Sequence, residues 1–348
     1  MGNSNQRRRR TNSSSIEAVA GNGLLDRRML LGHGVILAGA ASAAPLGSLT
    51  GAAAEPPAET LTEAPWSLEP GAVIQPYQLP SRFEKDVVRT VSNPSGQPSA
   101  SAAKTPHHLL SGTVTPNGLH FVVVYGGVPD IDPDKHRLVI HGLVRRPLVF
   151  TLDALARYPM VTRMTFLECG GNSTLLFSPQ PLQQNVQVLS FWESKVYAQI
   201  LPNGKAYQFY LLQEVKSYIT QPSPGLTLKE PGLYEISGIA YSGAGRITKV
   251  MVSADGGRSW AEAALQEPVL SKAFTRFRMP WRWDGGAAIL QSRAWDELGN
   301  VQPTRAEFVA KRGELKTVPP VAAFPNQHFN AVTSWAIDST GGVKHAYA

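Results

Sequence analysis

Cysteine is almost absent from this chain, because only one, Cys169, occurs among its 348 residues. A single thiol forms no disulfide within the chain, so no disulfide framework holds the fold together. Paired-cysteine zinc sites are excluded as well, and the scattered histidines supply no other zinc spacing. No C-x-x-C-H motif occurs, so any haem that serves this protein lies on another chain.

Several other signatures are missing. The net charge is +7, of which +4 belongs to residues 1–54. No stripe of Lys and Arg with interleaved aromatic residues follows, so nucleic-acid binding is not indicated. The apolar stretch Val35–Leu46 is too short, and too rich in Ala and Gly, for a transmembrane helix. No phosphate-binding glycine loop and no Ser-His-Asp order favours nucleotide or hydrolase chemistry.

The N-terminal residues have the form of an export signal. Asp26–Leu31 (D-R-R-M-L-L) is a twin-arginine motif, and an apolar stretch leads from it to an A-x-A signal at Ala52–Ala54. We expect residues 1–54 to be a signal peptide, cleaved near Ala54, that delivers the protein to the periplasm with no membrane anchor left. Because the twin-arginine route exports folded proteins, usually after a cofactor is inserted, it also indicates a cofactor.

Beyond the leader, the chain divides by composition. Residues 55–105 are rich in Pro, Ala and Ser and predict an extended, partly flexible segment, with ordered structure from near Leu109. Apolar runs bounded by turn residues then predict strands at 119–125, 137–141 and 148–151 and a short helix at 153–157.

The run Met164–Asn172 (M-T-F-L-E-C-G-G-N) contains the single cysteine. An apolar run followed at once by two glycines predicts the end of a buried strand that opens into a tight loop and presents the sulfur. A lone cysteine is either a small buried hydrophobe or a reactive group, and the local pattern leaves both interpretations open.

The C-terminal half predicts a different architecture. Strand-like runs recur between Gly, Pro, Asn and Asp turns, at 233–241, 247–254, 260–265, 274–283 and 288–296. This spacing favours an immunoglobulin-like sandwich over residues 216–313, with its tryptophans mainly in the core. We expect the tail, residues 314–348, to lie along a dimer or a partner.

Two blocks resemble the molybdenum-cofactor domain of the sulfite oxidase family: His136–Pro159 and Phe166–Ser173 (F-L-E-C-G-G-N-S). Two more, Ile236–Trp260 and Arg293–Pro303, resemble the dimerisation domain of that family. The likeness is strongest to its sulfane dehydrogenase (SoxC) subunits. It implies an α+β fold in which a mixed α/β molybdopterin domain, residues 106–215, precedes an all-β immunoglobulin-like dimerisation domain.

The resemblance assigns site residues. It makes the Cys169 thiolate the one protein ligand to molybdenum, and a soft anionic sulfur suits that metal. It places Tyr197 near the metal oxo group and Arg246 in a G-x-G-R turn near the substrate. Arg246 is either an anion contact or a hairpin arginine that bonds turn carbonyls. The expected cofactor-binding residues are Phe121, Tyr125, Gly170, Gly171 and Asn172.

The chain also departs from the family pattern. Val123 stands where the family has an arginine that meets the substrate anion, and Tyr125 stands where it has a histidine. His120 lies nearby, but strand alternation predicts that it faces away and has no site role. At Leu189-Ser190 a long segment of the cofactor domain is missing, which predicts exposed strand edges and apolar faces.

The implied function is oxidation of sulfite or of protein-bound sulfane sulfur by oxo transfer at a molybdenum–molybdopterin cofactor. Electrons pass to a dihaem c-type cytochrome of the SoxD kind, a sulfur-carrier protein is a further partner, and the C-terminal domain forms a homodimer. The alternative is a catalytically impaired remnant that acts only in dimerisation and partner binding. An adhesion module is a third reading, which the cysteine motif and the leader both oppose.

Overall fold

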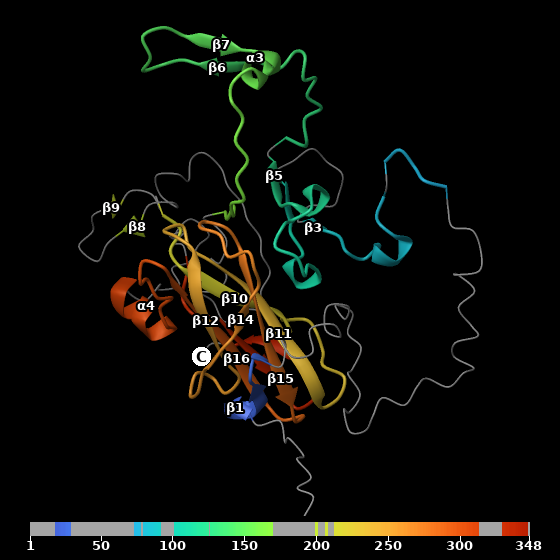
Figure 1. Ribbon diagram of the computed structural model, residues 1–348, viewed down its shortest axis with the longest axis vertical. Coiled ribbons are helices and arrows are strands. Elements are labelled where there is room, and N and C mark those ends of the chain that lie inside the picture. The colour runs from blue at the N-terminus through green and yellow to red at the C-terminus, as the bar shows by residue number, and fades with distance from the viewer. Residues whose placement is uncertain are drawn as a thin grey trace, which may run out of the picture.

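The structure is a computed structural model, shown in Figure 1. It describes residues 18–28, 73–77, 79–91, 101–124, 126–169, 199–200, 206–207, 212–312 and 329–346. Two antiparallel sheets that share one core make up most of the described chain. In the described residues no helix is long and apolar enough to cross a membrane.

The first sheet has the order β1-β2-β15-β11-β10, with β14 paired to β15. Its strands are β10 (Lys216–Gln221), β11 (Gly232–Tyr241), β14 (Ala264–Leu265), β15 (Thr275–Trp283), β1 (Ala18–Ala20) and β2 (Leu24–Leu25). The second sheet has the order β13-β12-β16-β17-β18. Its strands are β12 (Ile247–Ser253), β13 (Ala261–Glu262), β16 (Ala288–Asp296), β17 (Ser334–Ile337) and β18 (Val343–Ala346).

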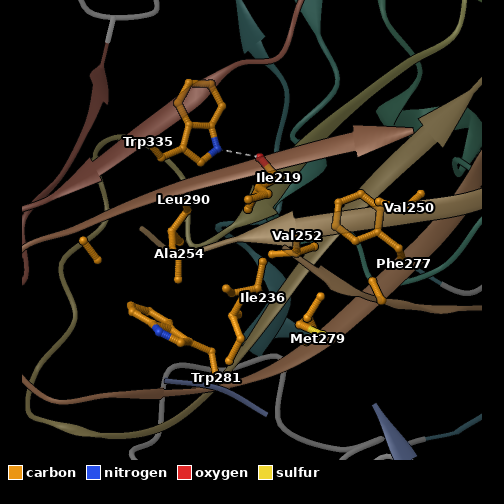
Figure 2. Packing of buried hydrophobic residues seen from close by; sticks show 14 of the residues in the cluster. Ile219, Ile236, Val250, Val252, Ala254, Phe277, Met279, Trp281, Leu290 and Trp335 are labelled. Atoms are coloured by element: carbon orange, nitrogen blue, oxygen red, sulfur yellow. Dashed lines mark hydrogen bonds between the residues drawn. The ribbon is translucent and has the colours of Figure 1, made fainter. Parts of the chain in front are cut away.

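The core lies between these two sheets (Figure 2). Ile236 and Trp281 of the first sheet meet Val252 and Leu290 of the second, and all four are buried. Burial of each such side chain contributes about 1.5–3 kcal/mol, so packing alone can hold a sandwich that has no disulfide. The Trp335 indole N–H, on β17, donates to the carbonyl oxygen of Ile219 on β10 at 2.9 Å and so ties the two sheets together.

The expected strands of the C-terminal half are therefore present, but the sandwich takes residues from outside 216–313. β17 and β18 come from the segment that the sequence assigned to a tail along a partner. β1 and β2 come from the segment that it assigned to a cleaved leader. The reason is pairing: β17 lies against β16, and β2 lies against β15, so each covers an edge that the middle strands leave open.

A small sheet precedes the cysteine segment, in the order β3 (Thr90–Val91), β4 (Ser101–Lys104), β5 (Val122–Val124). Short 3-10 turns, η3 (Arg82–Glu84), η4 (His107–Leu109) and η5 (Asn117–Leu119), lie around it. Order therefore begins before Leu109, contrary to the expectation, because β4 pairs with both β3 and β5.

A hairpin of β6 (Leu138–Ile140) and β7 (Leu148–Phe150), followed by α3 (Leu152–Ala156), stands away from the sandwich in Figure 1. The Thr151 hydroxyl accepts from the backbone N–H of Ala154 at 3.1 Å and begins the helix. Both strands keep apolar side chains exposed, among them Val139 and Val149. The remaining elements are β8 (Gln199–Ile200), which pairs with β9 (Ala206–Tyr207), and α4 (Arg305–Arg312).

The strand expected to end at Cys169 does not form. Residues 159–169 make no strand, and Leu167 is exposed. The other predicted apolar runs form strands because a neighbouring strand pairs with each of them. Here the backbone N–H of Phe166 donates to the carbonyl of Lys272, but no strand among the described residues pairs with the segment. It therefore runs as irregular chain over the sandwich surface.

Candidate functional site

The cysteine segment lies on one end of the sandwich. The backbone N–H of Phe166 donates to the carbonyl oxygen of Lys272 at 2.9 Å. The Phe166 ring lies 4.6 Å from that of Tyr241 and 5.9 Å from that of Phe274, centroid to centroid. These ring contacts fix the chain three residues before Cys169, whose side chain is half-buried.

The residue directly before the cysteine enters a buried ion pair. Glu168 Oε1 lies 2.8 Å from Lys216 Nζ, and the two side chains are only 6% and 3% exposed. The Tyr241 hydroxyl also hydrogen-bonds the Glu168 side chain. Burial, and secondly the Glu168 charge, raises the pKa of Tyr241 well above its ordinary value, so it stays a neutral donor. Removing one partner of such a pair leaves a buried charge uncompensated.

A cluster of partly buried aromatic groups extends this contact next to the cysteine segment. The His107 ring lies 5.9 Å from that of Phe274 and 6.3 Å from that of Tyr218. Burial first, then the charges of Arg276 and His108, lowers the pKa of His107 to about 4, against the opposite effect of Glu168. Since that value is far below neutral pH, His107 is an uncharged ring in this cluster.

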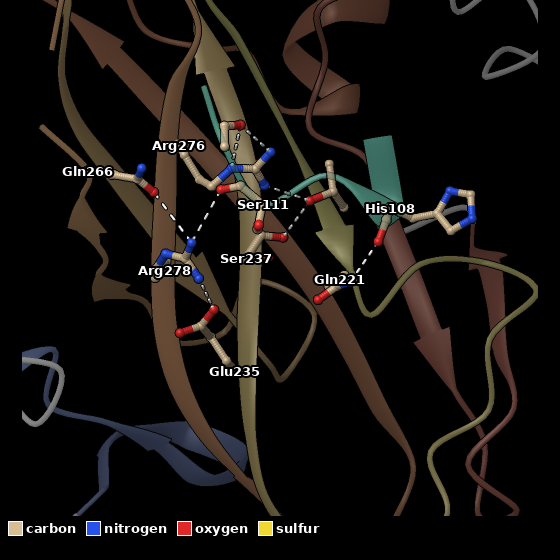
Figure 3. A network of polar contacts seen from close by, with 10 residues as sticks. His108, Ser111, Gln221, Glu235, Ser237, Gln266, Arg276 and Arg278 are labelled. Atoms are coloured by element: carbon tan, nitrogen blue, oxygen red, sulfur yellow. Dashed lines mark hydrogen bonds and ion pairs between the residues drawn. The ribbon is translucent and has the colours of Figure 1, made fainter. Parts of the chain in front are cut away.

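Two arginines of β15 hold the loop that follows His108 (Figure 3). Arg276 donates from Nη2 to the Gly112 carbonyl at 3.0 Å, and Arg278 donates to the Ser111 carbonyl at 3.3 Å. Arg278 also pairs with Glu235 at 2.5 Å. Burial, followed by the charge of Arg278, lowers the pKa of Arg276 to about 10, so Arg276 is still a cation at neutral pH. Their donors are directed at backbone carbonyls and a carboxylate, so they serve to position the chain.

Arg246 lies in the turn between β11 and β12, where its side chain is 57% exposed. Its Nε lies 3.0 Å from Glu297 Oε2, and its backbone N–H donates to Glu297 Oε1 at 2.9 Å. The sequence left two alternatives for Arg246, an anion contact or an arginine that bonds turn carbonyls. In the structure its guanidinium contacts the Glu297 carboxylate rather than turn carbonyls. An anion that binds Arg246 has to compete with Glu297.

One residue connects the Arg246 turn to the cysteine segment. Lys272 N–H donates to the Gly245 carbonyl at 3.3 Å, and the Lys272 carbonyl accepts from Phe166. Lys272 has φ 57°, a left-handed conformation that turns its two backbone groups toward these two partners. The fold therefore brings the two predicted site elements, far apart in sequence, to the same end of the sandwich.

Phe121 is half-buried just before β5 and stacks on His120, with ring centroids 4.9 Å apart. His120 Nδ1 lies 2.9 Å from the Phe121 carbonyl oxygen, so this histidine makes a local contact. Val123 lies on β5, an edge strand of the small sheet, and pairs with Ala102 of the middle strand β4. Five other predicted site residues lie outside the described residues: Tyr125, Gly170, Gly171, Asn172 and Tyr197.

The sequence interpretation missed the buried polar cluster. In the sequence Glu168 belongs to the cysteine motif, and nothing in the motifs points to Lys216. No local signal marked Lys216, because the burial of the strand K-S-Y-I-T-Q that it opens is seen only in the structure. A lysine inside such a strand requires an opposite charge. Its partner, 48 residues away, could not be identified from local pattern.

Two family models match the chain. Residues 207–318 match the Mo-co oxidoreductase dimerisation domain, and residues 125–196 match the oxidoreductase molybdopterin binding domain.

Curated relatives match over short stretches. A nitrate reductase [NADH] of Ulva prolifera is 42% identical over 64 residues, 18% of this chain and 7% of the relative. The sulfite oxidase of Gallus gallus is 36% identical over 110 residues, 30% of this chain and 24% of the relative. The chain therefore spans only a small part of the length of these relatives.

A solved structure matches far more of the chain. The crystal structure of the sulfane dehydrogenase SoxCD from Paracoccus pantotrophus aligns with a TM-score of 0.73 at 28% identity. The alignment covers 84% of this chain and all of the matched chain.

The matched domains imply a molybdenum–molybdopterin cofactor, which confirms that expectation. In the described part of the chain, no group of three or more His, Cys, Asp and Glu side chains could hold a metal ion. Molybdenum held by a dithiolene needs one soft protein donor rather than such a group, and Cys169 is the candidate for that donor. The half-buried thiol, on a segment fixed by Phe166 and Glu168, fits that role.

Proposed function

Because the chain belongs to the sulfite oxidase family of molybdenum-cofactor oxidoreductases, close to SoxC, we propose that it oxidises sulfite or protein-bound sulfane sulfur. The observation that carries the proposal is the placement of Cys169: the family's single thiol ligand follows directly after a carboxylate locked to the sandwich by a buried ion pair. The likeness to a sulfane dehydrogenase over 84% of the chain supports this substrate class.

When bound, the cofactor supplies oxygen-atom transfer to sulfur and accepts the electrons released. The chain's part is to hold and orient. Cys169 would hold the metal through its thiolate, and the Glu168–Lys216 pair with the Phe166 ring contacts keeps the backbone beside it in one position. A ligand fixed in this way need not be reordered when the cofactor binds.

Arg246 provides the cation for an anionic substrate in this proposal. Its guanidinium is more than half exposed and is held by Glu297. Sulfite brings two negative charges and displaces the carboxylate of Glu297 by stronger charge-assisted bonds to the same donors. Val123 in place of an arginine makes Arg246 the more important of the two positions. Tyr197 remains a predicted neighbour of the metal, outside the described residues.

Partners and location belong to the proposal too. A homodimer through the sandwich is supported by the match of residues 207–318 to a dimerisation domain. A dihaem c-type cytochrome of the SoxD kind as electron acceptor, and a sulfur-carrier protein, follow from the likeness to SoxCD. The twin-arginine motif supports the periplasm as the site of action.

Molybdenum content and activity of the purified full-length chain test the proposal together. We expect about one molybdenum per chain and sulfite-dependent reduction of cytochrome c, both abolished in Cys169→Ser. A chain that carries molybdenum but reduces no cytochrome with sulfite or a protein-bound sulfane would contradict the substrate class. Absence of molybdenum from the chain would contradict the proposed enzymatic function.

A second candidate is a non-catalytic protein that keeps the dimerisation sandwich and binds a partner. The observation that favours it is the exposed apolar surface of the β6–β7 hairpin, where Val139 and Val149 face solvent, together with Val123 at the arginine position. This candidate predicts a stable homodimer that has no molybdenum. Sedimentation velocity combined with metal analysis distinguishes the two functions.

A further inference from the structure

The segment that carries the twin-arginine motif is part of the folded sandwich. β1 and β2 form a hairpin around Gly21–Gly23, and Leu24 pairs with Trp281 of β15. The side chains of Leu24 and Leu25 are 0% and 1% exposed. In Figure 1 this blue segment lies beside β15, although more than 250 residues separate the two in sequence. Two leucines buried this completely make the segment a strand of the fold.

Hydrogen bonds from both sheets hold the hairpin tip. The Trp281 indole N–H, from the first sheet, donates to the Asn22 carbonyl at 2.7 Å. The Asn22 amide donates to the Ala254 carbonyl, which follows β12 of the second sheet, at 2.8 Å. The Gly21 N–H donates to the Ser259 hydroxyl at 2.6 Å. The segment thus closes one end of the gap between the two sheets.

The groove accepts this sequence because two glycines fit it closely. Gly23 has φ +86°, and a Cβ there would strike the carbonyl oxygen of Arg282, which is backbone and cannot move aside. A Cβ on Gly21 would strike the carboxylate of Asp255. The groove is therefore specific for a Gly-Asn-Gly turn followed by Leu-Leu rather than for any apolar strand.

The docked segment also holds the first arginine of the motif. Arg27 Nη1 pairs with the Glu262 carboxylate and also donates to the Ala263 carbonyl at 3.4 Å. The backbone N–H of Arg28 donates to Asp26 Oδ1 at 2.8 Å. Both side chains of the Arg27–Glu262 pair are about two-fifths exposed, so the contact fixes the arginine without burying it.

We propose that residues 18–28 are an intramolecular ligand of the sandwich, a latch that has to leave its groove before the Arg27-Arg28 pair can be read as an export signal. A receptor that contacts both arginines needs the guanidinium of Arg27, which Glu262 and the Ala263 carbonyl hold while the latch is docked. Docking and recognition of the arginines therefore exclude each other. Once the chain has folded with the latch docked, the segment is retained as a strand instead of being removed with the leader.

Trypsin cleavage of the full-length chain tests docking, because Arg27 and Arg28 are trypsin sites. Gly23→Ala should displace the latch from its groove, because the added Cβ would strike the carbonyl oxygen of Arg282. Gly118→Ala is the matched control, since no atom lies within 4 Å of the added Cβ there. We expect cleavage after Arg27 to be about tenfold faster or more in Gly23→Ala, and unchanged in Gly118→Ala, because cleavage follows the population of the undocked state. Equal rates in Gly23→Ala and the unsubstituted chain would overturn the proposal.

Binding in trans tests the groove independently. A fluorescent peptide of residues 17–28 is titrated into full-length Gly23→Ala and followed by anisotropy. We expect saturable binding, and at least tenfold weaker binding of the same peptide with Gly23→Ala, about 1.4 kcal/mol. Failure of the unsubstituted peptide to bind, or equal binding of both peptides, would contradict a sequence-specific groove.

Export tests the consequence. In a host that has the twin-arginine pathway, the exported fraction of the chain is measured for the unsubstituted protein, Gly23→Ala and Gly118→Ala. We expect Gly23→Ala to raise that fraction and Gly118→Ala to leave it unchanged. An unchanged or lower fraction for Gly23→Ala would show that docking does not withhold the arginines.

Discussion

Lys216 Nζ lies 2.8 Å from Glu168 Oε1, with both side chains almost fully buried, and this pair joins the first residue of β10 to the residue before Cys169. The contact fixes the backbone next to Cys169 to the sandwich. The ring contacts of Phe166 and the Lys272 carbonyl reinforce it from the other side. The two predicted domains thus meet where the proposed metal ligand lies.

The first prediction concerns this ion pair. Lys216→Met leaves a buried Glu168 without its cation and should lower the free energy of unfolding by about 3–5 kcal/mol, measured with denaturant. The double variant Lys216→Met, Glu168→Gln should recover a large part of that loss. Lys344→Met is the control, because its pair with Asp338 is exposed and contributes little. A single variant as stable as the unsubstituted chain would contradict the structural role of the pair.

The second prediction separates the metal ligand from the fold. Cys169 lies outside the buried core cluster, so Cys169→Ser should leave the unfolding free energy within about 0.5 kcal/mol of the unsubstituted value. Molybdenum content, by mass spectrometry, should fall to background. Retained molybdenum would remove the ligand assignment, while a large loss of stability would mean that the thiol has a core role.

The third prediction is a pH dependence. The pKa of His107 falls from 6.5 to about 4 on folding, so the unfolded chain binds more protons between these values. The stability that the neutral ring provides is fully present above pH 6.5 and is lost as the pH falls toward 4, by about 3 kcal/mol in total. His107→Phe should flatten this part of the curve, and His136→Phe, at an exposed position, should not. Denaturant unfolding at several pH values measures both.

The fourth prediction concerns the C-terminal strands. Trp335 is buried and bonds to the Ile219 carbonyl, so Trp335→Ala should reduce stability by about 3–5 kcal/mol. Truncation after residue 313 removes β17 and β18 and should prevent the sandwich from folding. Leu298→Ala, at an exposed side chain, should change stability by less than about 0.5 kcal/mol. A folded truncated chain would restore the interpretation of a separate tail.

The fifth prediction tests anion recognition. Glu297→Gln weakens the hold on the Arg246 guanidinium and should lower the KM for sulfite, whereas Arg246→Ala should raise it with a smaller effect on kcat. The exposed pair contributes little to stability, so unfolding curves should stay nearly unchanged. If the KM of both variants equals that of the unsubstituted chain, Arg246 does not bind the substrate.

The sequence by itself determined the strands of the middle of the sandwich, since alternation and turn residues act locally at 233–241, 247–254, 274–283 and 288–296. It also determined the cysteine motif and the resemblance to the family, because both lie in runs of adjacent residues. It failed at Met164–Cys169, where an apolar run predicted a strand and no neighbouring strand pairs with it.

Only the tertiary structure decided which distant segments complete the sandwich and support the site. β2 lies against β15, β17 lies against β16, and Lys216 meets Glu168 across 48 residues. Such contacts form only where the rest of the fold leaves a strand edge unpaired or a buried charge without a counter-charge. Local sequence pattern does not contain this information. Leu24 and Leu25 therefore fall within the predicted leader in the sequence, but form a buried strand in the fold.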